Sequence, residues 1–183
     1  AWTFLTQLEQ LYSVEQFASD ISTIPNNTDI LLIVHPQHYS QALLFAIDQF
    51  ALAGGKVIVF LDPHNESDQM AMMAGHNHSG NSSNLEELLK AWGVQFSSDE
   101  VLLDAMAGLD IRTQTGGITR HFGFVGLSTE QLDRQDVLTA NLEIINGASF
   151  GVLNQTADAT TNWSPLIEST ENADIIDTDT YVA

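Results

Sequence analysis

Two continuous apolar runs mark the most regular part of the chain. Ile30–Val34 and Val57–Leu61 contain no polar residue, which is typical of strands buried on both faces of a parallel sheet. Between them, apolar residues recur at helical spacing from Leu43 to Phe50, and Gly54-Gly55 ends the pattern. We therefore predict a strand–helix–strand unit with two parallel strands, the helix forming the crossover.

The remaining elements are predicted from shorter patterns. Apolar residues at helical spacing predict one helix over residues 3–12 and another that starts after Asn84 as its N-cap and runs to Trp92. We expect one α/β domain over residues 1–183, with a core of mostly parallel sheet over about 1–110 and a β-rich extension over about 111–183. Short strands are predicted at 14–17, 94–96, 121–125 and 142–145, with turns at Gly116-Gly117 and Asn146-Gly147.

The charge balance excludes two classes of partner. Only 5 Lys and Arg residues oppose 24 Asp and Glu residues, which gives a formal net charge of −19. Nucleic-acid binding depends on basic residues that displace counterions, so we expect none. An anionic membrane surface is disfavoured for the same reason. No apolar run approaches the roughly 20 residues of a membrane-spanning helix, so we expect the chain as given to be soluble.

Enzymatic chemistry finds little support in the residue types. The chain contains no cysteine, and therefore no thiolate nucleophile, disulfide or cysteine-based zinc site. It lacks a phosphate-binding loop, because Gly54-Gly55 precedes a strand instead of following one. We expect no Gly-x-Ser-x-Gly nucleophile elbow, no catalytic residue and no cofactor.

Polar residues at the ends of the two predicted parallel strands form the first candidate site. His35 and His38 follow the first strand, and Asp62 and His64 follow the second. Ligands of open parallel sheets bind at the carboxyl ends of the strands, so these four side chains are candidate binding residues. The structural alternative is that Asp62 caps a turn and His35 satisfies a hydrogen bond at the strand end.

The polar segment 64–83 is the second candidate. His76 and His78 could share a metal ion if the loop folds back. Glycine- and asparagine-rich loops do not preorganise ligands, and the chain has no His-Glu-x-x-His pair. A solvated surface loop is therefore the default interpretation, and a metal-dependent hydrolase is retained only as an alternative.

Several segments in order carry a family resemblance. They are Thr28–Pro36, Ala46–Phe50, Gly54–Pro63, Asn84–Val94 and Val101–Asp104. Together they resemble the GldG-type ABC transport system auxiliary family, a group of gliding-motility-associated and uncharacterised transport accessory proteins. The resemblance implies a flavodoxin-like or class I glutamine-amidotransferase-like three-layer α/β fold. Amidotransferases use a cysteine nucleophile that this chain lacks, so their activity does not carry over.

The resemblance also implies a setting and partners. It implies an extracytoplasmic (periplasmic) domain of an inner-membrane protein, held by flanking transmembrane helices beside an ABC permease and a separate ATPase. The expected function is that of a non-enzymatic auxiliary or binding component of a bacterial ABC-type transport complex. A small-molecule or sugar-binding domain that uses the same strand ends is the main alternative.

Overall fold

The computed structural model describes residues 3–66, 82–113 and 115–182, and its chain divides into two compact units. The first unit contains residues 1–31 and 38–57, and the second contains residues 32–37 and 58–183. The boundary crosses both strands of the predicted strand–helix–strand unit. The prediction that residues 1–183 form a single domain stays a prediction.

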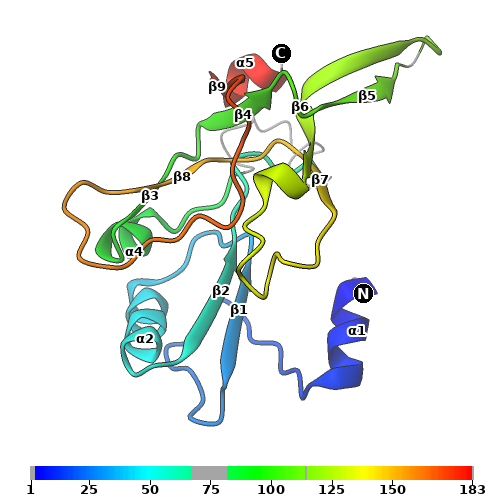
Figure 1. The fold of residues 1–183 in the computed structure, drawn as a ribbon. Helices are drawn as coiled ribbons and strands as arrows, with labels where there is room; N and C mark the ends of the chain where they lie inside the picture. Colours follow the sequence, from blue (N-terminus) through cyan, green and yellow to red (C-terminus); the bar gives the residue numbers. More distant parts are fainter. Residues whose placement is uncertain (1–2, 67–81, 114, 183) are drawn as a thin grey trace. The chain divides into compact units, whose positions relative to one another are not determined.

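The strand–helix–strand unit forms as the apolar pattern predicts (Figure 1). Strand β1 (Ile30–Val34) and strand β2 (Lys56–Phe60) form a parallel pair, and helix α2 (Gln41–Leu52) connects them. The Ser40 side chain caps α2 by accepting a hydrogen bond from the Leu43 amide at 3.2 Å. The helix ends at Ala53, and Gly54 takes a φ of +93° that favours glycine.

Burial of this two-stranded sheet differs from the prediction. Along each strand, residues alternate between more and less exposed, so the apolar runs are not covered on both faces. On one face Leu32, Ile58 and Phe60 remain 36%, 46% and 57% exposed. A run without polar residues therefore indicates a strand correctly, but it does not show that both of its faces are covered.

The second unit is built from antiparallel pairs. Strand β3 pairs with β8, β4 pairs with β9, and β5, β6 and β7 form a three-stranded sheet. In Figure 1 the β5–β6 hairpin extends away from the rest of this unit. Its strands are β3 (Val94–Phe96), β4 (Glu100–Asp104), β5 (Gly108–Arg112), β6 (Ile118–Ser128), β7 (Ile144–Ala148), β8 (Leu153–Gln155) and β9 (Ala173–Asp177); its helices are α4 (Glu86–Ala91), η2 (Thr129–Gln131) and α5 (Thr178–Val182).

The predicted mostly parallel, flavodoxin-like or amidotransferase-like sheet is therefore wrong. The structure is 21% helix and 30% strand, and in the part of the chain that it describes the sheets are small and mostly antiparallel, with a single parallel pair. The spacing of the strands explains the difference. Only residues 97–99 separate β3 from β4, and only 105–107 separate β4 from β5. A parallel connection needs a crossover of about a dozen residues or more, so neither β3 and β4 nor β4 and β5 can be parallel neighbours. The three strands pair antiparallel with β8, β9 and β6 instead.

Some local predictions hold and others fail. The helix at 3–12 is present as α1 (Thr3–Leu11), whereas no strand forms at 14–17. Asn84 is not an N-cap: helix α4 begins after Leu85, and the Asn84 amide donates instead to the Pro36 carbonyl at 2.7 Å. The predicted turn at 146–147 lies inside β7, where both residues pair with β6. The turn at 116–117 does connect β5 to β6.

A buried carboxylate fixes the centre of the second unit. Asp104, at the end of β4, is fully buried. Its Oδ1 accepts hydrogen bonds from the amides of Met106 (3.0 Å) and Ala107 (2.9 Å) and from the Thr170 hydroxyl (2.7 Å). Its Oδ2 accepts from the Thr170 amide at 2.8 Å. The side chain thus holds the β4–β5 turn to a segment that is 66 residues away in sequence.

Candidate functional site

Three segments of the second unit meet at the ends of β1 and β2. The His35 amide donates to the Phe60 carbonyl at 2.9 Å, so the two strand ends stay side by side. The Ser83 hydroxyl is fully buried and lies 3.0 Å from His35 Nδ1, and it accepts a hydrogen bond from the Asp62 amide at 2.9 Å. Ser83 therefore ties the residues after both strands to the chain that enters α4.

Both nitrogens of the His35 ring have neighbours within hydrogen-bond distance. Nδ1 lies beside Ser83 Oγ, and Nε2 lies 3.1 Å from Gln37 Nε2. The same Gln37 nitrogen also donates to the Ser82 carbonyl at 3.2 Å. A neutral ring that is protonated on Nδ1 satisfies both contacts. His35 is thus held in place by its own chain, with a φ of +48° that few non-glycine residues adopt.

Asp62 adds the charged group to this cluster. Its Oδ2 lies 3.8 Å from His35 Nδ1, and its side chain is 46% exposed. Partial burial raises the pKa of the Asp62 carboxyl above its ordinary value, and the nearby imidazoles of His35 and His64 oppose that rise. The approach of Ser83 and Asp62 to the same ring nitrogen rules out a Ser-His-Asp relay here, because such a relay needs the serine on one nitrogen and the acid on the other.

His64 belongs to a second polar cluster, where the chain after β2 meets β7 and α5. Its ring is 4% exposed, and its Nε2 lies 3.9 Å from Glu66 Oε2. The Ser149 hydroxyl donates to Glu66 and lies 3.4 Å from the Tyr181 hydroxyl. The Tyr181 ring makes edge contacts with the rings of His64 and His121. Burial raises the pKa of Tyr181, and the Glu66 carboxylate adds to the rise.

Ser149 corrects the expectation that no nucleophile motif is present. Gly147-Ala148-Ser149-Phe150-Gly151 has the Gly-x-Ser-x-Gly spacing, and Ser149 has the positive φ (53°) of a nucleophile elbow. The rest of the elbow is missing. Ser149 is fully buried, and the chain runs on to strand β8 instead of into a helix. The hydroxyl is therefore not presented to a substrate.

The glycines of the motif have a packing role. A Cβ atom on Gly147 would collide with the Phe150 ring, and one on Gly151 would lie 2.7 Å from the Phe96 ring. Close packing thus accounts for both glycines without catalysis. The Gly-x-Ser-x-Gly spacing can be recognised in the sequence, but the burial of Ser149 cannot.

The other predicted residues lie elsewhere. His38 belongs to the first unit, where it is exposed and has a φ of +54°. His76 and His78 lie outside the described residues. Among residues 3–66, 82–113 and 115–182, no three His, Asp or Glu side chains are grouped as a metal ion requires. Of the four candidates at the strand ends, the structure brings His35 and Asp62 together, whereas His64 belongs to the second cluster with Glu66 and Tyr181.

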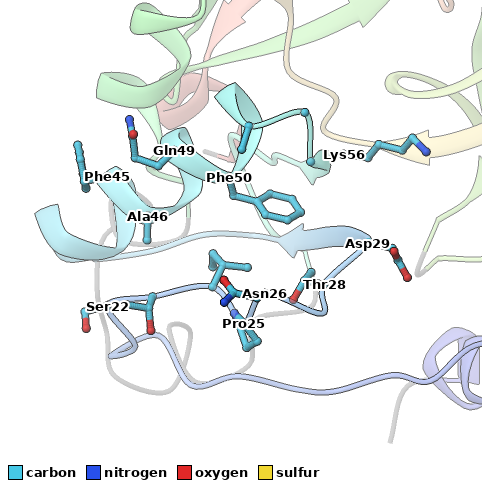
Figure 2. Close-up of a pocket in the computed structure, with 15 residues that line it drawn as sticks. Ser22, Pro25, Asn26, Thr28, Asp29, Phe45, Ala46, Gln49, Phe50 and Lys56 are labelled. Atoms are coloured by element: carbon cyan, nitrogen blue, oxygen red, sulfur yellow. The ribbon is translucent and has the colours of Figure 1, made fainter.

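A pocket that the sequence did not indicate lies within the first unit (Figure 2). It has a volume of about 700 Å³, and it is lined by residues of the 22–29 segment, by α2 and by the turn into β2. Figure 2 shows Asp29 and Lys56 at one end of the lining and Phe45 at the other. The size suits a small molecule, and the lining offers both charged and aromatic contacts. Sequence reasoning missed it because the 22–29 segment has no regular pattern.

Comparison with known proteins identifies the family. The family model described as "ABC-type uncharacterized transport system" matches residues 1–183. No curated protein and no solved structure matches the chain. Among the described residues, no helix is both long and apolar enough to cross a membrane. Since the match covers the whole sequence, the chain belongs to the family of auxiliary components of ABC-type uncharacterized transport systems.

Proposed function

We propose that this chain is a non-enzymatic binding and assembly component that acts beside the permease and ATPase of a bacterial ABC-type transport complex. The family match supports a role in such a system. The observation that carries the non-enzymatic part is the burial of both serines of the polar clusters. Ser83 and Ser149 are each 0% exposed and hydrogen-bonded within the chain.

The polar residues at the strand ends act as structural connections in this proposal. His35, Asp62 and Ser83 join three separate segments, and Glu66, Ser149 and Tyr181 join three more. Hydrogen-bonded networks of this kind fix the local structure. In this proposal they give the second unit a well-defined surface on which a partner can bind.

We further propose an extracytoplasmic location and a gliding-motility-like complex, following the resemblance in residues 28–104. The net charge of −19 supports contact with proteins over contact with anionic lipid or nucleic acid. No cofactor is part of this proposal.

The experiment is affinity purification of the protein from its own host, with quantitative mass spectrometry of the proteins that accompany it. We expect an ABC permease and an ATPase to be enriched over a mock purification. A well-expressed, intact protein that repeatedly enriches neither subunit would refute the assembly role.

The pocket in the first unit favours a second candidate, a small-molecule-binding domain. A ligand that binds only the folded state stabilises it by RT ln(1 + [L]/Kd), so the melting temperature rises with the ligand concentration. We expect Phe45→Ala and Asp29→Asn to abolish such a shift if this candidate is correct. A screen of small polar metabolites and sugars that shifts no melting temperature would count against it.

A further inference from the structure

The segment between η2 and β7 presents two apolar side chains to solvent. Val137 and Leu138 are 84% and 71% exposed, and Val137 is the most exposed of the large hydrophobic residues described. Leu142 and Ile144, which follow, are 39% and 52% exposed. The segment is coloured yellow in Figure 1. We refer to Val137 and Leu138 as the apolar tip.

The backbone of the tip is held by its own hydrogen bonds. Asp136 Oδ1 accepts from the Leu138 amide at 2.8 Å, and the Asp136 carbonyl accepts from the Ala140 amide at 2.8 Å. The Arg134 guanidinium donates to the Leu142 carbonyl at 2.7 Å. The buried Thr139 hydroxyl donates to the Asp133 carbonyl at 2.6 Å. The backbone of so constrained a turn loses little conformational freedom when a partner covers it.

The base of the segment is equally well fixed. Leu132 is 5% exposed and forms an isolated β-bridge with Ile167. The Asp133 amide donates to the Leu166 carbonyl, and the Glu168 amide donates to the Gln131 carbonyl, each at 2.9 Å. The tip is therefore an outward feature of a rigid part of the second unit.

The charged residues close to the tip in sequence indicate what kind of partner it binds. Asp133, Asp136 and Glu143 lie within six residues of it, and the one nearby cation, Arg134, is engaged with backbone carbonyls. An anionic lipid surface would be repelled by this arrangement. A protein pocket that is apolar inside and lined by Lys or Arg at its rim is complementary in both respects.

From these observations we propose that the apolar tip inserts into an apolar, basic-rimmed pocket on a protein subunit of the transport complex. This inference rests on the assembly role proposed above, because that role supplies the partner. The inference adds two things to that role: the surface that contacts the partner, Val137 and Leu138, and the apolar, basic-rimmed character of the partner's pocket.

The test compares three forms of the protein purified from the host: the unmodified chain, the double variant Val137→Ser/Leu138→Ser, and the control Ile118→Ser. Ile118 is 73% exposed and lies on β6 of the same unit, so it matches the tip in exposure but not in position. Because all three side chains are exposed, we expect the same melting temperature for each form. We expect the amount of permease and ATPase recovered with the double variant to fall by a factor of roughly ten or more. The control should recover as much of both subunits as the unmodified chain.

The outcomes separate the two proposals. Equal recovery by the double variant would overturn the inference and leave the assembly role standing. Recovery of neither subunit by the unmodified chain would overturn the assembly role, and the inference with it. A photo-crosslinking residue at position 138 checks the partner directly: adducts with a transport subunit support the inference, whereas adducts with lipid alone or with a second copy refute it.

The basic rim has its own test. Glu143 is exposed, and Glu143→Lys reverses a charge beside the tip without altering its apolar surface. We expect a several-fold loss of recovered permease and ATPase, because like charges across an interface repel. If Glu143→Lys recovers as much permease and ATPase as the unmodified chain, the proposal that the partner's pocket has a basic rim is refuted.

Discussion

Asp104→Asn is the substitution whose effect the structure defines most sharply. The buried carboxylate accepts four hydrogen bonds, three on Oδ1 and one on Oδ2. An asparagine keeps one acceptor oxygen and replaces the other with an NH₂ group. That group faces the Thr170 amide, so a donor meets a donor and at least one buried N–H loses its acceptor.

The magnitude follows from these contacts. A hydrogen bond to a charged group contributes about 1.5–3 kcal/mol, and a buried donor left without an acceptor costs about 1–3 kcal/mol. We expect Asp104→Asn to lower the free energy of unfolding by about 2–4 kcal/mol, and Asp104→Ala to lower it by more. For a chain of this length, the asparagine variant should melt roughly 5–15 °C lower.

The assay is urea denaturation followed by tryptophan fluorescence, with Asp110→Asn as the control. Asp110 is an exposed acid on the neighbouring strand β5, and its substitution should change the free energy of unfolding by less than about 0.5 kcal/mol. A loss below about 1 kcal/mol for Asp104→Asn would show that the four contacts do not act as described.

The pH dependence provides a second test of the same site. Burial alone would raise the pKa of Asp104, but the hydrogen bonds from Ala107, Thr170 and Met106 outweigh it and hold the pKa below its ordinary value. The contribution of Asp104 is therefore complete above the unfolded pKa of about 3.9 and is lost as pH falls through the lower folded pKa. We expect the stability gap between the unmodified chain and Asp104→Asn to be constant near neutral pH and to narrow in acid.

Three further substitutions test the polar clusters. Ser83→Ala removes the acceptor of the Asp62 amide and the partner of His35 Nδ1, and we expect it to lower the free energy of unfolding in urea by about 1–3 kcal/mol. Asp62→Asn should leave stability unchanged or slightly higher at pH 7, because the raised pKa of Asp62 means that its ionised form is disfavoured in the folded chain. This benefit should decrease as pH falls through the folded pKa and vanish below the unfolded pKa of about 3.9, and a clear loss of stability at pH 7 would contradict the reasoning. Gly123→Ala places a Cβ against the Tyr181 ring, and thermal melting should show a destabilisation of about 1–3 kcal/mol unless the ring swings away freely.

The sequence was most informative where the signal is local. The two apolar runs and the helical spacing between them predicted β1, α2 and β2, and Gly54 ended the helix because its positive φ favours glycine. The order of the segments from 28 to 104 indicated an ABC transport auxiliary protein, and the family match confirms that relationship in its general form.

Long-range pairing decided the rest. The sequence contains the residues of β4 and β9, but nothing local shows that Val101 pairs with Ile176 or that Asp104 accepts hydrogen bonds from Thr170. Burial is likewise a property of the folded chain. It distinguishes Ser149, which has the motif of a nucleophile but is enclosed, from the apolar tip, whose residues resemble core residues but face solvent.

The sequence by itself therefore determined the strand–helix–strand unit, the first helix, the acidic charge and, in its general form, the family. The tertiary structure determined the antiparallel arrangement of the second unit, the network at the strand ends, the pocket of the first unit and the exposure of Val137 and Leu138. The physical reason is the separation along the sequence over which each interaction acts. Helix and strand preferences act over a few residues, whereas strand pairing, hydrogen-bond satisfaction and burial depend on which distant segments meet.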